Sequence, residues 1–344
     1  MTKTILVVGG AGYIGSHTYV ELLAAGYDAV IVDDFSNAEQ RVIDRLVELT
    51  GHSVRLYEGD AADPRFMRSV FEAESGLTGA IHFAAYKAVG ESVREPLRYY
   101  RNNIDSMLVL LQTMADFDVP DLVFSSSCTV YGVPDELPVT EMTPRKDAHS
   151  PYGNTKRICE DIIRDAVTGG NHLKAVLLRY FNPIGAHPSA LIGELPIGVP
   201  NNLVPFVTQT AAGIRPELTI FGDNYETFDG TCIRDYIHVV DLARAHVKSL
   251  DYLEGVDGRG CCEAINVGTG RGNSVMEVVQ TFEQVAGVSL NYKIGPPRAG
   301  DVPAIYANAD KARYLLGWES QLTLEDALRD AWRWQGMLST KEKE

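Results

Sequence analysis

The sequence predicts an α/β fold, a doubly wound parallel sheet with a smaller, interleaved C-terminal domain. Short apolar, β-branched runs alternate with helical patterns through the first half of the chain, and a glycine-rich turn directly follows the first run. One further run, at 264–268, stands far downstream. We therefore expect a first domain at residues 1–182, to which a segment of about 233–268 returns, and a second domain mainly at 183–344.

Six runs are expected to build the sheet of the first domain. Their apolar residues are nearly continuous, which is typical of strands buried on both faces by helices. The runs are Thr4–Val8, Ala29–Val32, Val54–Tyr57, Gly79–Phe83, Asp121–Ser126 and Lys174–Tyr180. A chain of 344 residues is long enough for this core and for a second domain.

The stretch from Gly9 to Gly15, Gly-Gly-Ala-Gly-Tyr-Ile-Gly, separates the first strand from a helix expected to end at about Ala25. Glycines let the backbone turn tightly and approach a pyrophosphate, which the helix N-terminus then stabilises. The next strand ends at Asp33-Asp34, where a carboxylate can bond ribose hydroxyls and repel a 2′-phosphate. The sequence therefore predicts a Rossmann-type site for NAD rather than NADP, with a structural turn beside a solvated acidic loop as the alternative.

Polar residues also follow the next three strands, at the sheet edge where such folds bind ligands. Asp60 comes after the third strand, and the fourth runs into His82 and Lys87. We expect His82 to be packed or hydrogen-bonded, whereas Lys87 either meets a dinucleotide or is an ordinary surface lysine. The fifth strand ends in serines 125–127, which suit a nicotinamide site but are also common in loops.

The stretch Ser150–Lys156, Ser-Pro-Tyr-Gly-Asn-Thr-Lys, predicts the start of a helix because proline suits the first turn. Tyr152 and Lys156 are four residues apart, so they lie on the same helical face. A phenol has an ordinary pKa of about 10, and a neighbouring lysine cation favours its ionised form. The pair therefore indicates a general base, unless it is an incidental pair at a helix start.

Composition restricts the partners and the compartment. A net charge of −15 disfavours nucleic acid, and the four-residue apolar stretch near the N-terminus is too short for a signal peptide. No stretch approaches a membrane span, and the eight histidines lack the spacing of metal ligands. The cysteines, which show no CxxC spacing, are Cys128, Cys159, Cys232, Cys261 and Cys262. We expect reduced thiols in a cytoplasmic protein without a metal.

Taken together, these motifs make the chain similar to the extended short-chain dehydrogenase/reductase family from Thr4 to about Trp334, and within it to the enzymes that interconvert UDP-glucose and UDP-galactose. The resemblance is carried by the glycine-rich turn, His82–Ser92, Ser125–Gly132, Tyr152-x-x-x-Lys156, Arg179–Pro188, Pro200–Leu203, Asp229–Val239 and Arg298–Asp301. The chain departs from the family at Ala85, where glycine is usual, and at Cys128, where alanine is usual.

The resemblance implies an NAD-dependent isomerase. In this family the residue matching Tyr152 takes the proton from the sugar O4 as a phenolate while C4 gives its hydride to the nicotinamide. Lys156 would lower the pKa of Tyr152 and bond the nicotinamide ribose, and Ser127 would relay the proton. The 4-keto sugar then turns over, anchored by UDP, and takes the hydride back on its other face.

The resemblance also implies binding residues and a homodimer. The positions expected to bind NAD are Gly9, Gly12, Tyr13, Ile14, Gly15, Asp33, Asp34, Phe35, Ser36, Asn37, Ala38, Asp60, Ala61, Phe83, Ala84, Ala85, Tyr86, Lys87, Asn102, Ser127, Tyr152, Lys156 and Phe181. Those expected to bind the UDP-hexose are Ser127, Tyr152, Asn182, Asn202, Leu203, Thr219, Ile220, Phe221, Arg234, Arg298, Asp301 and Ile305. Ile305 matches the position that borders the C2 substituent of the sugar, although an ordinary core residue is the alternative. A helix expected at about 96–117 carries enough apolar residues for a subunit interface, or equally for plain core packing.

Two other functions stay open at this point. Nucleotide-sugar 4,6-dehydratases of the same family carry an Asp-Glu pair after the strand-five hydroxyl residue, where this chain has Cys128 and Thr129. A catalytically silent, NAD-sensing binding protein would have no need of the Tyr152 and Lys156 pair. Both alternatives predict no conversion of UDP-galactose into UDP-glucose.

Overall fold

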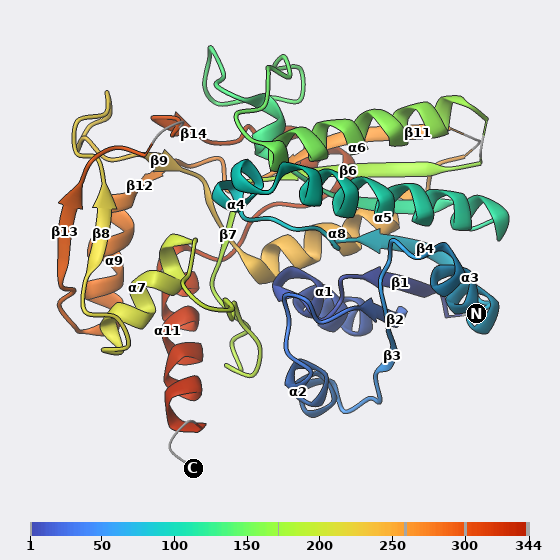
Figure 1. The fold of residues 1–344 in the computed structure, drawn as a ribbon, viewed down its shortest axis with the longest axis horizontal. Helices are drawn as coiled ribbons and strands as arrows, with labels where there is room; N and C mark the ends of the chain where they lie inside the picture. Colours follow the sequence, from blue (N-terminus) through green and yellow to red (C-terminus); the bar gives the residue numbers. More distant parts are fainter. Residues whose placement is uncertain (1, 171, 258–259, 299–300, 342–344) are drawn as a thin grey trace.

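The centre of the structure is a parallel sheet of seven strands, in a computed structural model that describes residues 2–170, 172–257, 260–298 and 301–341 (Figure 1). The strands lie in the order β11, β6, β5, β4, β1, β2, β3. Their bounds are β1 Thr4–Val8, β2 Asp28–Asp33, β3 Arg55–Glu58, β4 Leu77–His82, β5 Asp121–Ser127, β6 Lys174–Tyr180 and β11 Cys261–Val267. This order is that of a doubly wound fold with one extra strand beside β6, so the predicted fold class is confirmed.

The predicted strands are all present, and their ends differ from the prediction by a few residues. The fourth strand begins at Leu77 rather than Gly79 because Leu77 pairs with Thr4 of β1 across an irregular register. The late strand begins at Cys261 rather than Ala264 because Cys261 pairs with Lys174. In both places the strand begins where its backbone pairs with a neighbouring strand, and an apolar sequence pattern does not show where that pairing starts.

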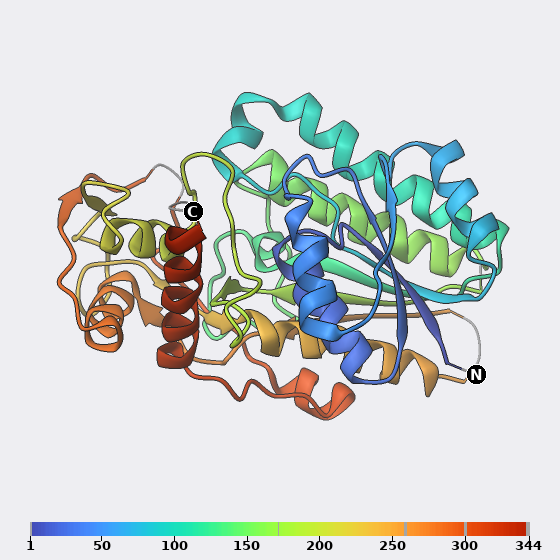
Figure 2. The ribbon, with the colours of Figure 1, turned by 90° about the horizontal axis from the view of Figure 1, so that it is seen from below.

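Helices cover both faces of the sheet. One face packs against α1 (Tyr13–Ala24), α2 (Arg41–Thr50) and α8 (Val239–Glu254). The other packs against α3 (Pro64–Ala73), α5 (Pro96–Asp116) and α6 (Pro151–Thr168). In Figure 2, α5 (cyan) and α6 (green) lie on one side of the sheet and α8 (gold) lies on the other. Both faces of the central strands are therefore buried, as their apolar composition predicts.

A second lobe lies beyond the carboxyl end of the sheet, with its own apolar core (Figure 2). Its helices are α7 (Leu203–Ala211), α9 (Val275–Ala286) and α11 (Leu324–Lys341). Its small sheets pair β8 (Leu218–Phe221) with β13 (Tyr292–Gly295), and β9 (Ile233–Arg234) with both β12 (Asn273–Ser274) and β14 (Ala304–Ile305). Two short strands, β7 (Asn182–Ile184) and β10 (Tyr236–His238), pair with each other where the chain passes between the lobes.

Three short elements complete the described chain. The helix α4 (Val89–Arg94) precedes α5, the 3₁₀ helix η1 (Cys128–Tyr131) follows β5, and α10 (Asp310–Leu316) packs against α8. Among the described residues, no helix is long and apolar enough to cross a membrane.

The turn from β1 into α1 is closed by glycines in contact with backbone. Gly9 has a φ of 82°, and a Cβ there would lie 2.6 Å from the Ala84 nitrogen. A Cβ on Gly15 would lie 2.2 Å from the Gly9 carbonyl oxygen. Because neither neighbour is a flexible side chain, any larger residue would force the turn, the first turn of α1 and the loop after β4 apart.

Replacing Gly15 by alanine should therefore destabilise the fold by about 1–3 kcal/mol, the usual cost of forcing atoms into a packed site. Thermal denaturation of Gly15→Ala beside Gly76→Ala measures this, because a Cβ on Gly76 meets nothing within 4 Å. A Gly15→Ala variant as stable as the Gly76→Ala control would contradict the described packing of the turn.

Candidate active site

The residues predicted to bind NAD lie along the carboxyl edge of the sheet. Most of them come at or just after the end of a strand: residues 9–15 at β1, 33–38 at β2, 60–61 at β3, 83–87 at β4, Ser127 at β5 and Phe181 at β6. The others are Tyr152 and Lys156 in the first turns of α6, and Asn102 on α5. The structure thus gathers segments that are far apart in the sequence. A doubly wound sheet binds its ligands at this edge.

Asp33 connects the end of β2 to the glycine-rich turn. One carboxylate oxygen accepts the backbone N–H of Ala11 at 2.9 Å, and the other accepts that of Phe35 at 2.9 Å. Burial raises the pKa of this carboxyl group, and the backbone donors act against burial. Phe35 has a φ of 56°, an uncommon backbone conformation for a residue with a side chain.

These features fit a dinucleotide. The N-terminus of α1 has no side-chain cap, so its N–H groups are available to an anion, and the glycines keep side chains away from it. A carboxylate accepts up to about four hydrogen bonds, so Asp33 keeps capacity for ribose hydroxyls beyond its backbone partners. The residues present therefore suit the NAD that the sequence predicts.

The loop after β4 is bound to α6 by Asn103, which the sequence analysis did not single out. Its side chain accepts the N–H of Tyr86 at 2.9 Å and donates to the Tyr86 carbonyl at 3.1 Å and to Thr155 Oγ1 at 3.0 Å. Asn103 is buried on the same stripe of α5 as Met107 and Leu110. A polar residue on an apolar helical stripe is the sequence signal that could have identified it.

Ser127, Tyr152 and Lys156 are brought together where β5 ends and α6 begins. Ser127 is the last residue of β5 and caps η1. The hydroxyl of Ser150 accepts the N–H of Gly153 at 3.2 Å, so α6 begins at Pro151 as the sequence predicts. The arrangement therefore places a phenol and an ammonium on one face of a helix, beside a hydroxyl from the sheet.

Lys156 is fully enclosed by the protein. Its Nζ donates to the Ser125 carbonyl at 2.7 Å and lies 6.0 Å from the centre of the Tyr152 ring. Burial lowers the Lys156 pKa to about 8. The lysine is thereby fixed both to β5 and to the helix that carries the tyrosine.

The Tyr152 pKa differs from the expectation. The sequence predicts that Lys156 lowers it, but in the described chain burial raises it well above the ordinary value, with Tyr180 adding to the rise. A hydrogen bond with Ser127 acts in the opposite direction. Burial outweighs the lysine because a phenolate loses its hydration there, while the ammonium is 6.0 Å away from the ring centre. In the described chain, burial therefore favours the protonated form of Tyr152.

Besides Ser127 and Tyr152, the predicted UDP-hexose residues form three groups. In the first, Ile305 of β14 pairs in register with Arg234 of β9, and its buried side chain packs with Cys128 and Phe181. This group therefore adjoins the end of β5. Asn182, whose N–H donates to the Asp235 carbonyl at 2.9 Å, lies close by in β7.

The second group lies in the outer lobe. The Arg298 guanidinium stacks over the Phe221 ring at 4.0 Å, and Asp301 pairs with Arg234 at 3.7 Å. The side chain of Ile220, between Thr219 and Phe221, is buried in the core of this lobe, so only its backbone can meet a ligand. Residues 299 and 300 of the Arg298–Asp301 motif lie outside the described residues.

Asn202 and Leu203 lie at the start of α7. The Asn202 amide donates to Glu194 Oε1 at 2.6 Å, and Lys87 Nζ lies 3.4 Å from the same oxygen. Glu194, which the sequence analysis did not identify, therefore joins one residue expected to bind NAD to one expected to bind the substrate. Lys87 lies 107 residues before Glu194 in the sequence, so no local pattern indicates that the two meet.

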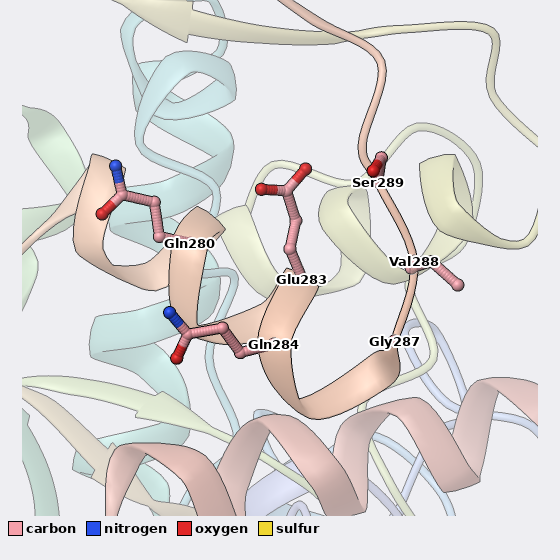
Figure 3. Close-up of a pocket in the computed structure, with 6 residues that line it drawn as sticks. All are labelled: Gln280, Glu283, Gln284, Gly287, Val288 and Ser289. Carbon is pink, nitrogen blue, oxygen red and sulfur yellow. The ribbon is translucent and has the colours of Figure 1, made fainter.

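A hollow on the surface of the outer lobe contains none of the predicted site residues. Figure 3 shows its lining, which is Gln280, Glu283, Gln284, Gly287, Val288 and Ser289. Glu283 accepts the backbone N–H of Leu290 at 2.7 Å, so it stabilises the end of α9. Within the described residues, no group of three or more His, Cys, Asp or Glu side chains is placed to hold a metal ion.

Known proteins resemble the chain over almost its whole length. A family model described as GDP-mannose 4,6 dehydratase matches residues 6–331. The UDP-glucose 4-epimerase of Bacillus subtilis is 50% identical over 331 residues, which are 96% of each chain. The chain belongs to the UDP-glucose 4-epimerases of the extended short-chain dehydrogenase/reductase family.

Solved UDP-glucose 4-epimerases share the fold. The enzyme from Bifidobacterium longum, in complex with NAD+ and UDP, is 47% identical with a TM-score of 0.93, over 97% of this chain and 98% of that one. The enzyme from Stenotrophomonas maltophila, with bound NAD and formylated UDP-arabinopyranose, is 44% identical with a TM-score of 0.95, over 98% and 99% of the two chains. These epimerases with bound NAD agree with the NAD site predicted from the glycine-rich turn.

Replacing Asp33 by alanine should lower the NAD content of the purified protein, because it removes the ribose acceptor and frees the N–H of Ala11. Asp326→Ala is the matched control, since Asp326 also accepts a backbone N–H, from Thr323 at 3.0 Å, but on α11. Absorbance and chromatography of the released cofactor measure the content. Equal NAD in the two variants would refute the role of Asp33.

Proposed function

We propose that the protein interconverts UDP-glucose and UDP-galactose, with Tyr152 as the general base, Ser127 as the proton relay and Lys156 as the group that favours the phenolate. The observation that carries the proposal is the placement of these residues at the carboxyl edge of the sheet, beside a turn built for a dinucleotide. A general base of this kind contributes about 10²–10⁴-fold to a rate.

The chain's own residues would act as follows. Tyr152 takes the proton of the sugar O4, and Ser127, which hydrogen-bonds with Tyr152, passes it between the two oxygens. Bound NAD supplies the hydride acceptor for C4 and, when oxidised, a positive charge. The burial of the site excludes water, so the proton stays on Tyr152 while the 4-keto hexose turns, and it returns to O4 with the hydride.

The substrate is proposed to be anchored through its nucleotide. Arg234 and Arg298 suit a diphosphate because a guanidinium forks onto two phosphate oxygens. Arg234 is paired with Asp301, and Arg298 is stacked on Phe221, so both are oriented before a ligand arrives. An anchor at the nucleotide leaves the hexose free to rotate, so that either face of C4 can be presented to the hydride.

The structure gives a reason to prefer epimerisation over dehydration. Elimination of water by a dehydratase requires an acid and a base after the strand-five hydroxyl residue. Burial raises the pKa of the Cys128 thiol to about 12, and Thr129 has only a hydroxyl group. Neither residue is suited to acid–base chemistry near neutral pH.

We also propose a homodimer and a cytoplasmic location. Val93 of α4 and Leu97 and Leu108 of α5 have 60%, 81% and 47% of their surface exposed, so large apolar side chains stand on the outside of these two helices. In the proposed homodimer a second copy of the chain would cover them, because removing apolar surface from water is favourable. The free thiols of all five cysteines are consistent with a reducing compartment.

Incubation of the purified protein with UDP-galactose, without added reductant, tests the activity directly. Formation of UDP-glucose supports an epimerase, formation of a 4-keto-6-deoxy sugar supports a dehydratase, and no turnover with NAD bound supports a silent binding protein.

Tyr152→Phe should lower turnover by about 10²–10⁴-fold, the contribution of a general base, while NAD stays bound. The variant keeps the ring and removes only the hydroxyl group that carries the proton. Tyr314→Phe is the control, because Tyr314 is an exposed surface residue. Near-normal turnover of Tyr152→Phe would overturn the assignment of the base.

Ile305→Tyr should suppress epimerisation of N-acetylated UDP-hexoses selectively, because the larger ring takes the space of the C2 substituent. The parent should act clearly on UDP-glucose and UDP-galactose and more weakly on their N-acetylated forms, since such pockets discriminate by only about 1–3 kcal/mol. The ratio of kcat/KM for the two substrate classes measures the effect. Ile214→Tyr, at an exposed position, is the control. Equal losses on both classes, or no change on either, would exclude Ile305 as the gate.

A further inference from the structure

A buried ion pair lies directly behind the proposed catalytic residues. Glu160 is on α6, one helical turn after Lys156, and has none of its surface exposed. Arg179 of β6 donates to both of its carboxylate oxygens, from Nε at 2.8 Å and from Nη2 at 2.6 Å. Although burial acts to raise the Glu160 pKa, the hydrogen bonds and charge of Arg179 hold it below its ordinary value.

Glu160 also connects α6 to the strand that ends in Ser127. The hydroxyl of Ser126 donates to Glu160 Oε1 at 2.6 Å. Since Lys156 donates to the carbonyl of Ser125, two neighbouring residues of β5 are bound to one face of α6. Tyr152, Lys156 and Glu160 are spaced four apart on that face, so these bonds fix the face that carries the phenol.

Arg179 extends the network to the other side of the site. Its Nη1 donates to Tyr131 Oη at 3.1 Å, and Tyr131 Oη donates to Asn266 Oδ1 at 2.6 Å. Tyr131 is the last residue of η1, the short helix that Ser127 caps. Arg179 therefore bridges the helix that carries Tyr152 and the short helix that Ser127 caps.

Stability alone accounts poorly for this arrangement. A buried ion pair pays a large desolvation cost, and well-packed apolar residues often replace one without loss of stability. What apolar residues could not reproduce is the directed set of hydrogen bonds from one guanidinium to two separate helices. The geometry of the Ser127 and Tyr152 oxygens depends on how these two helices sit relative to each other.

We propose that Arg179 is a positioning residue that sets Ser127 against Tyr152 through Glu160 on one side and Tyr131 on the other. The inference rests on the proposed epimerase function. Its consequence is that removing the hydrogen bond between Arg179 and Tyr131 shifts Ser127 and weakens the hydrogen bond that favours ionised Tyr152. The other groups that face the phenol, Lys156, Tyr180, Cys128 and Tyr99, keep their places.

The test uses the NAD-loaded protein with Tyr131→Phe, which removes one oxygen atom and leaves the ring in the core. We expect kcat to fall about tenfold or more, as small displacements of reacting groups do, with KM and NAD content unchanged. The acid limb of the pH profile of kcat should move to higher pH, because Tyr152 loses part of the interaction that lowers its pKa. Arg179→Lys, which cannot contact both helices with a planar fork, should show the same changes more strongly.

Tyr27→Phe is the matched control. Tyr27 Oη donates to Asp251 at 2.8 Å, and the residue lies just before β2, at the amino end of the sheet. If Tyr131→Phe lowers only the melting temperature, as Tyr27→Phe does, and leaves kcat and its pH profile unchanged, the positioning role is wrong. A parent protein with no epimerase activity would instead refute the proposed function. Should Arg179→Lys not fold, Tyr131→Phe still decides the proposal.

Discussion

A parallel sheet puts the carboxyl ends of its strands along one edge, and the proposed site depends on this constraint. The residues that follow β1, β2, β3, β4 and β5 meet there although they are far apart in the sequence. The glycine-rich turn leaves room for a ligand at this edge, because Gly9 and Gly15 carry no side chain and let the start of α1 approach the loop after β4. The second lobe then needs only to hold a ligand over that edge.

The sequence predicts those parts of the site that a local pattern records. The glycine spacing, the aspartates after β2 and the four-residue spacing of Tyr152 and Lys156 each belong to one short segment, and the structure places them as expected at the sheet edge. Asn103 is marked only as a polar residue on an apolar stripe, and no local pattern indicates that its partners are Tyr86 and Thr155. Glu194 escapes such reading because its partner Lys87 lies far along the chain. The core position of the Ile220 side chain was missed as well, since which face of a short strand is buried depends on its neighbours in space.

The pKa of Tyr152 is the property of the site that residue spacing could not predict. A tyrosine and a lysine four residues apart predict how each shifts the other's pKa, but not how far each side chain is buried away from water. Burial acts on both, raising the Tyr152 pKa and lowering that of Lys156 to about 8, so the enclosed site favours the uncharged form of each group. The same enclosure strengthens the interaction of both groups with any charge that a ligand brings.

The pairing of β11 with β6 has a consequence for how the protein is made. β6 ends at Tyr180, but its neighbour on the outer side begins only at Cys261, after α7, β8, β9 and α8 have been synthesised. Until the ribosome has passed that point, the nascent sheet carries an open edge of unpaired backbone N–H and C=O groups, the kind of surface on which other chains can add. Any fragment that stops near residue 182 keeps that edge permanently, so a nucleotide-binding half cut at this point would be prone to aggregate.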